Sequence, residues 1–107
     1  MATSIHQRAS ARRDLVEHYI YFAENAGIET ADRFLRSTEK SFHDLCKHPE
    51  MGSPLSLPSP KLAGLRKWPV SGAFDNILIF YLPRGASISI VRVLHTAQDW
   101  WSILGIQ

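Results

Sequence analysis

Hydrophobic residues near the start of the chain recur at the spacing of an amphipathic helix. Between residues 11 and 26 an apolar side chain returns every three or four positions, and Val16 and Ile20 widen the apolar stripe. Gly27 follows as a helix terminator. The pattern therefore predicts one amphipathic helix that ends at this glycine.

A second stripe of the same period begins at Ala31. Charged residues occupy its opposite side: Arg33, Arg36, Glu39, Lys40 and Asp44. Because the connection between the two stripes is short, we expect an antiparallel helix hairpin whose second helix stops near His48. Residues 3–8 alternate loosely, as in a short strand, and Ser10 stands where the N-cap of the first helix is expected.

The pattern then changes from helices to strands. Residues 47–60 are rich in proline, glycine and serine, which favours loops and turns. Three runs of β-branched, aliphatic and aromatic residues follow, at 65–70, 77–82 and 88–94. The run at 77–82 is apolar on both faces, which predicts a central strand that is covered on each side.

The two helices can cover only one face of this sheet. The candidates for the other face are a bound partner or the C-terminal segment, which contains Trp100, Trp101, Ile103, Leu104 and Ile106. A short protein with an apolar surplus on one sheet face is a candidate for binding an amphipathic segment of another chain. We therefore expect the free chain to expose apolar sheet surface and to be poorly soluble alone.

Composition limits the classes of protein that are possible. With 107 residues the chain is predicted to be a single α+β domain spanning 1–107, and 45% hydrophobic and 21% charged residues indicate a folded core. A net charge of +2 is too small for a dedicated nucleic-acid binder. Cys46 is the only cysteine, and neither a signal-peptide pattern nor a membrane-spanning run occurs, so we expect a cytoplasmic protein without a membrane partner.

Four local sequences follow one another along these predicted elements. They are RRDLVEHYI at 12–20, ADRFL at 31–35, HPEMG at 48–52 with GLRKWPV at 64–70, and IFY at 79–81 with VRVLH at 91–95 and Asp99. Together with the order strand, helix hairpin, proline-rich loop and three-stranded antiparallel meander, they resemble the ParE/RelE superfamily of toxins from type II toxin-antitoxin systems. The resemblance covers nearly the whole chain and implies the α+β fold of these toxins.

The ending at residues 92–99, with the pattern RVLHxxxD, is more similar to the ParE branch, whose members poison DNA gyrase, than to the RelE branch. This implies a toxin that inhibits DNA gyrase by binding and is neutralised by a ParD-like antitoxin, whose amphipathic helix would cover the sheet and helix-hairpin grooves. Operator DNA would be reached only indirectly, through the antitoxin. The family often has a second arginine before the final aspartate, where this chain has Gln98.

Two alternatives stay open at this point. The chain could be a RelE-like endoribonuclease that cuts mRNA on the ribosome, or a non-toxic scaffold that only binds its antitoxin. Ribosome-dependent RNA cleavage needs a base, an acid and cations near the phosphate. The residues that could supply these groups are Arg92, His95, Arg66 and Tyr81.

Binding of a target or partner has an overlapping set of candidates: Arg66, Arg92, His95, Asp99, Arg12 and Arg13. Each has a structural interpretation as well. Arg92 could pair with a carboxylate such as Asp99, and His95 could form a hydrogen bond with Asp99 that fixes the turn after the strand. Arg12 and Arg13 lie unfavourably near a helix N-terminus and are interpreted first as solvated surface.

Strand alternation adds expectations about faces. Arg92 should share a face with Ile88, Ile90 and Leu94, and His95 should lie on the opposite face. Arg66 and Lys67 should point to opposite faces of their strand, with Trp68 packed in the core on the side of Arg66.

Metal and cofactor chemistry find little support in the sequence. His43 and Cys46 stand three positions apart on the second predicted helix, but no second pair with metal-ligand spacing accompanies them. Motifs of common hydrolases, nucleotide-binding loops and paired catalytic carboxylates do not occur either. We therefore expect neither a metal nor a cofactor.

Overall fold

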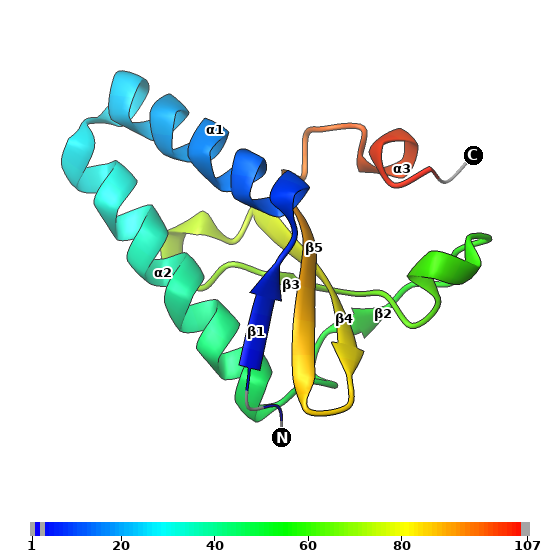
Figure 1. The fold of residues 1–107 in the computed structure, drawn as a ribbon. Coiled ribbons are helices and arrows are strands. Elements are labelled where there is room, and N and C mark those ends of the chain that lie inside the picture. Colours follow the sequence, from blue (N-terminus) through cyan, green and yellow to red (C-terminus); the bar gives the residue numbers. More distant parts are fainter. Residues whose placement is uncertain (1, 3, 106–107) are drawn as a thin grey trace.

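Five strands form one sheet in the order β1-β5-β4-β3-β2, and two long helices lie against it (Figure 1). The computed structural model describes residue 2 and residues 4–105. The elements are, in chain order, β1 (Ser4–Gln7), α1 (Ala9–Ala26), α2 (Ile28–Lys47), β2 (Ser53–Pro54), the 3-10 turn η1 (Pro60–Leu62), β3 (Arg66–Pro69), the 3-10 turn η2 (Gly72–Phe74), β4 (Ile77–Arg84), β5 (Ser87–His95) and α3 (Trp100–Ile103). The predicted α+β order of strand, helix hairpin and antiparallel strands is confirmed.

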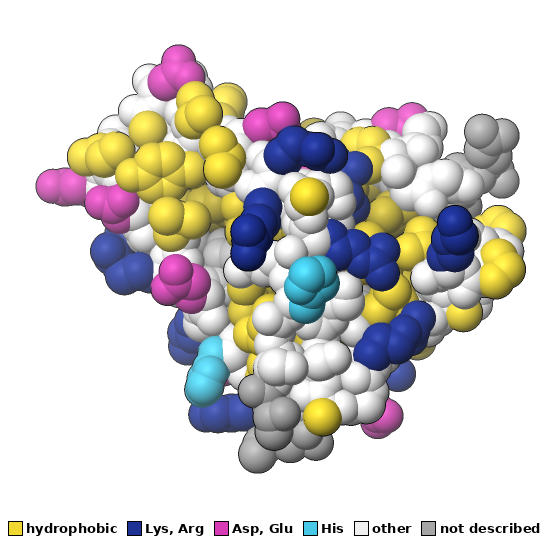
Figure 2. Space-filling model, in the orientation of Figure 1, with side chains coloured by type: hydrophobic (Ala, Val, Ile, Leu, Met, Phe, Trp, Pro, Cys, Tyr) yellow, Lys and Arg dark blue, Asp and Glu magenta, His cyan; other side chains and the backbone are white. Residues whose placement is uncertain are grey.

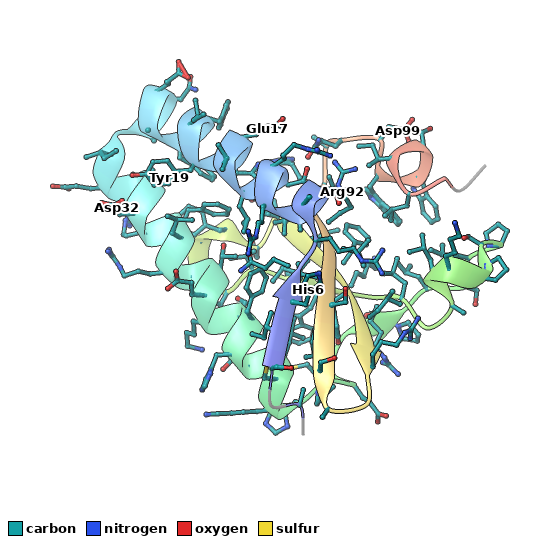
Figure 3. All side chains as sticks on the ribbon, in the orientation of Figure 1. His6, Glu17, Tyr19, Asp32, Arg92 and Asp99 are labelled. Carbon is teal, nitrogen blue, oxygen red and sulfur yellow. The ribbon has the colours of Figure 1, made fainter. Side chains whose placement is uncertain are left out.

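The hairpin of α1 and α2 turns at Gly27. This residue has φ 97°, a backbone conformation that side chains with a Cβ rarely adopt, so glycine allows the chain to reverse within one residue. A hydrogen bond of 2.9 Å from the Tyr19 hydroxyl to Asp32 Oδ1 joins the two helices near the turn (Figure 3). The predicted antiparallel hairpin is therefore present, and both of its helices begin earlier than the sequence pattern indicated.

The start of α1 differs from the prediction. The helix begins at Ala9, and Arg8 is its N-cap residue without a side-chain capping bond. Ser10 lies inside the first turn, and its hydroxyl donates to the carbonyl of Val91 at 3.0 Å. The prediction of Ser10 as the N-cap is wrong because this hydroxyl serves a neighbouring strand and not the helix terminus.

One face of the sheet packs against the helix hairpin. Buried aliphatic and aromatic residues from both layers meet there, including Phe34, Phe42, Leu45, Ile79, Ile88, Ile90 and Val93. Aromatic rings also pack together: Phe34 lies 5.1 Å from Phe22 in a tilted contact and 5.6 Å from Phe74 in an edge contact, measured between ring centroids. Burying a side chain of this size contributes about 1.5–3 kcal/mol, so this layer is a major source of the fold's stability.

The opposite face of the sheet is covered by the chain itself. Its buried residues are Leu65, Phe80, Leu82, Val91, Leu94 and Leu104, and partly buried Leu55, Leu57, Leu62 and Trp100 pack against them. The C-terminal segment therefore covers this face, as one of the two predicted alternatives required. Leucines of the proline-rich loop also cover this face, a contribution that was not predicted from the sequence.

A bulge in β5 changes the predicted alternation. Tyr81 pairs with Ile90 whereas Phe80 pairs with Arg92, so Val91 is an extra residue in β5. After this bulge Val93 joins Ile90 in the helix-facing core, and Leu94 faces the other side. The predicted common face of Arg92, Ile88, Ile90 and Leu94 is therefore wrong.

Candidate functional site

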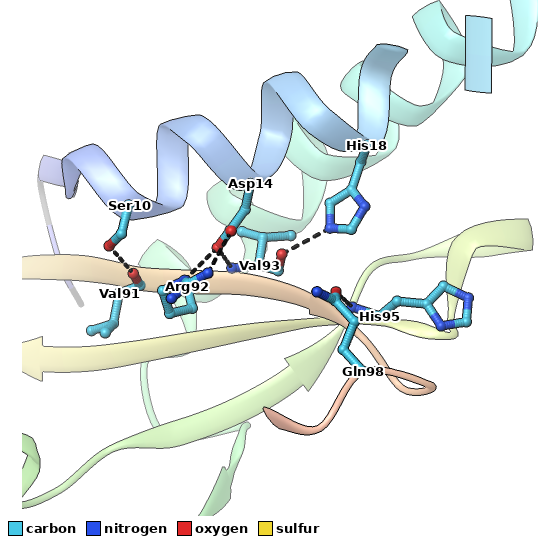
Figure 4. A network of polar contacts seen from close by, with 8 residues as sticks. All are labelled: Ser10, Asp14, His18, Val91, Arg92, Val93, His95 and Gln98. Atoms are coloured by element: carbon cyan, nitrogen blue, oxygen red, sulfur yellow. Dashed lines mark hydrogen bonds and ion pairs between the residues drawn. The ribbon is translucent and has the colours of Figure 1, made fainter. Parts of the chain in front are cut away.

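Three polar side chains on α1 complete the outer edge of β5. β1 pairs with β5 only as far as Ile90, so the following peptide groups need other partners. Ser10 donates to the Val91 carbonyl at 3.0 Å, the Val93 N–H donates to Asp14 Oδ2 at 2.9 Å, and His18 Nε2 donates to the Val93 carbonyl at 2.8 Å (Figure 4). We call Ser10, Asp14 and His18 the inner stripe, because they are spaced four residues apart on the sheet side of α1.

Asp14 also holds Arg92 through a bidentate ion pair. Arg92 Nε lies 2.7 Å from Asp14 Oδ2, and Nη2 lies 2.8 Å from Oδ1. Asp14 is only 5% exposed, so water screens the pair weakly. The hydrogen bonds to Asp14 raise the pKa of Arg92 above its usual value, with a further contribution from the charge of Glu17. Arg92 is therefore a cross-link between the first helix and the last strand.

Asp99 has neither of the roles expected for it. Arg92 pairs with Asp14 and not with Asp99, and the His95 ring bonds to Ala97 and Asn76 and not to Asp99. Instead, Asp99 is the N-cap residue of α3, where its carboxylate accepts from the Ser102 hydroxyl at 2.8 Å and from the Ser102 N–H at 3.4 Å. Both predicted pairings of Asp99 are wrong because this carboxylate caps a short helix that the sequence analysis did not identify.

The His95 ring stabilises the turn after β5. Its Nδ1 accepts a 2.9 Å hydrogen bond from the Ala97 N–H, and Nε2 lies 3.1 Å from the Asn76 side-chain amide. The His95 N–H in turn donates to the Gln98 side chain at 2.7 Å. The ring points away from Arg92 (Figure 4), so these two candidates do not converge on one site.

Tyr81 and Arg66 both hold the loop before β2. The Tyr81 hydroxyl donates to the Pro49 carbonyl at 2.8 Å and accepts from the Gly52 N–H at 2.9 Å. Arg66 Nη1 donates to the carbonyls of Gly52 at 2.6 Å and Glu50 at 3.0 Å. A Cβ at position 52 would collide with the Tyr81 hydroxyl, which explains the glycine. Burial raises the pKa of Tyr81, which disfavours the phenolate form further.

The other aromatic and cationic residues of β3 lie as predicted. Trp68 packs against the helix-facing core, in register with Ile79, whereas Lys67 points to the opposite face. There the Lys67 ammonium lies 5.5 Å from the centroid of the Trp100 ring. Trp101 stacks on Trp100 with centroids 3.9 Å apart and is 50% exposed.

The solvent side of α1 carries a second series with four-residue spacing. We call Arg12, Val16, Ile20 and Glu24 the outer stripe. Val16 and Ile20 were expected to widen the buried side of the helix, but they are 57% and 48% exposed. The reason is that the inner stripe faces the sheet and turns them towards solvent. Arg12 and Arg13 are exposed, and neither forms an ion pair with another described residue, in agreement with solvated surface.

Metal ligands do not gather in the part of the chain that the structure describes, where no group of three or more histidine, cysteine, aspartate or glutamate side chains could hold an ion. His43 is exposed and Cys46 is half-buried, and burial raises the pKa of the Cys46 thiol. Nor does a helix of the described residues have the length and apolar character needed to cross a membrane.

The fold is shared with a bacterial toxin-antitoxin structure. A solved chain described as "Chromosomal ParDE TA system from P. aeruginosa" matches with a TM-score of 0.64 and 19% sequence identity, and the match covers 87% of this chain and 95% of that chain. The search of curated proteins found no match. The family model for the "ParE toxin of type II toxin-antitoxin system, parDE" matches residues 5–100. The chain therefore belongs to the ParE toxin family.

Proposed function

We propose that this toxin acts by binding DNA gyrase and not by cutting RNA, and that a ParD-like antitoxin neutralises it in the cytoplasm. The four candidate catalytic side chains all form hydrogen bonds within the fold, and this observation supports inhibition by binding over RNA cleavage. Membership of the ParE toxin family supports gyrase as the target and a ParD-like antitoxin as the partner.

RNA cleavage would require these groups to be free and to meet at one phosphate. The Tyr81 hydroxyl has both a donor and an acceptor partner, and its raised pKa opposes the phenolate form that a general base would need. The Arg92 guanidinium is bonded to Asp14, and the Arg66 guanidinium is bonded to two loop carbonyls. These arrangements favour inhibition by binding, for which the surface and not a reacting centre matters.

The antitoxin would cover apolar surface that the chain leaves exposed. Loop leucines and the C-terminal segment fill the second sheet face, so an amphipathic helix would dock on the outside of that cover. Trp101 and Ile103 on α3 are 50% and 38% exposed and could serve as anchors for its apolar side. Operator DNA would be contacted by the antitoxin and not by this chain, in keeping with a net charge of only +2.

The test compares two activities of the purified chain. We expect it to inhibit supercoiling by gyrase and to leave mRNA intact during translation on ribosomes. Under this proposal His95 is a residue of the turn after β5, bonded to Ala97 and Asn76, and not a contact to gyrase. A His95→Ala chain that circular dichroism shows to be folded should therefore inhibit gyrase as strongly as the parent chain. Cleavage of mRNA that disappears in His95→Ala would instead establish the ribonuclease alternative, and an absence of both activities would favour a scaffold that only binds its antitoxin.

A further inference from the structure

The outer stripe is complementary to itself when its direction is reversed. Along α1 it reads cation, aliphatic, aliphatic, anion, with four residues between successive members. A two-fold axis that passes between two α1 helices, beside the outer stripe at the level of residue 18, would place Arg12 opposite Glu24 of a second copy and Val16 opposite Ile20. We propose that this face is the interface of a symmetric dimer formed by two copies of this chain, independently of the gyrase and antitoxin proposal.

The exposure of the stripe supports an interface. Val16 and Ile20 are 57% and 48% exposed on a regular helix, although burial of either apolar side chain would be stabilising. They are the two central members of the stripe, where contacts between crossing helices concentrate. Figure 2 shows further apolar side chains over the end of the hairpin, and Tyr21 and Ile28, which are 61% and 57% exposed, extend the apolar surface in that direction.

The charges at the two ends of the stripe form no ion pair with another described residue. Among the described residues the side-chain ion pairs are Lys40 with Asp44 and Arg92 with Asp14, so both Arg12 and Glu24 remain available. In the symmetric arrangement each Arg12 meets one Glu24, which gives two equivalent ion pairs that flank the aliphatic contacts. A parallel arrangement would instead bring like charges together, so the charge pattern selects the antiparallel dimer.

Helix packing geometry allows this contact. Residues four apart form a ridge, and the ridges of two helices interlock when their axes cross at about 50°. Because the inner stripe occupies the other side of α1, such a contact would leave the hydrogen bonds to β5 undisturbed. One helix face is smaller than the roughly 800 Å² per partner of a standard interface, so we expect a weak dimer that dissociates on dilution.

Charge reversal tests the proposal. The full chain, produced by cell-free synthesis, is examined by sedimentation velocity over a series of concentrations. We expect a monomer-dimer equilibrium that Arg12→Glu and Glu24→Arg each weaken by roughly tenfold, because each substitution turns two attractions into repulsions. The double variant carrying both changes restores opposite charges at both contacts and should recover most of the affinity.

Arg36→Glu is the matched control, because it makes the same charge change on the exposed side of α2. It should leave the dissociation constant unchanged. A chain that stays monomeric at all concentrations would overturn the proposal and leave this face to another partner such as the antitoxin. The proposal would also be overturned if charge reversal at position 12 or 24 left the dissociation constant of the dimer unchanged. The same holds if the double variant dimerised no more tightly than the single variants.

Discussion

The inner and outer stripes of α1 have the same four-residue spacing but opposite environments. Every member of the inner stripe is bonded to the backbone of β5, where the sheet has no further strand. The outer stripe has no polar partner among the described residues and carries two exposed aliphatic side chains. Periodicity therefore locates a helix face, whereas the unpaired peptide groups of a neighbouring strand determine which face becomes part of the fold.

Asp14→Ala should have the largest effect of the substitutions that distinguish the two stripes. It leaves the Arg92 guanidinium and the buried Val93 N–H without their acceptor. Breaking a largely buried ion pair in this way costs about 3–5 kcal/mol in the free energy of unfolding. Urea unfolding followed by circular dichroism measures this change.

Asp14→Asn is the control for that experiment, because it keeps the shape and one acceptor oxygen while removing the charge. We expect its free energy of unfolding to lie between those of Asp14→Ala and the parent chain. If Asp14→Ala lost less than about 1 kcal/mol, the cost would be that of an exposed ion pair, and the inner stripe would not be a structural requirement.

Ser10→Ala should have a smaller effect. It removes one neutral hydrogen bond to the Val91 carbonyl at the bulge and makes no cavity of note. We expect a loss of about 1 kcal/mol in the free energy of unfolding. Thermal unfolding at several scan rates checks it, and a loss as large as that of Asp14→Ala would mean that the hydroxyl also determines how the helix begins.

The sequence was sufficient to predict the two long helices and the central strand, because each depends on a local pattern. The two apolar stripes predict α1 and α2, and an apolar run on both faces predicts β4. The faces of β5 could not be predicted, since one extra residue at Val91 reverses the alternation beyond it. Such a bulge arises from pairing between strands and leaves no clear mark in the sequence of one of them.

The candidate site shows the same limit. Proximity in sequence suggested Asp99 as the partner of Arg92, whereas the observed partner is Asp14, which lies 78 positions away. Asp14 is a charged residue on a predicted helix, for which solvent exposure is the usual expectation. The spacing of Ser10, Asp14 and His18 was nevertheless visible, and a polar series on the buried side of a helix is a signal that an adjoining strand edge needs partners.

Val16→Ser should have the smallest effect on the fold and is the clearest test of the difference between the stripes. An exposed aliphatic side chain away from internal contacts contributes little, so we expect the free energy of unfolding to change by less than about 0.5 kcal/mol. The same substitution removes apolar area from the centre of the proposed dimer and should weaken self-association. Urea unfolding at a concentration where the chain is monomeric measures the first effect, and sedimentation measures the second. A large loss of stability in the monomer would place Val16 in the folding core, and the outer stripe would then be explained without a second copy.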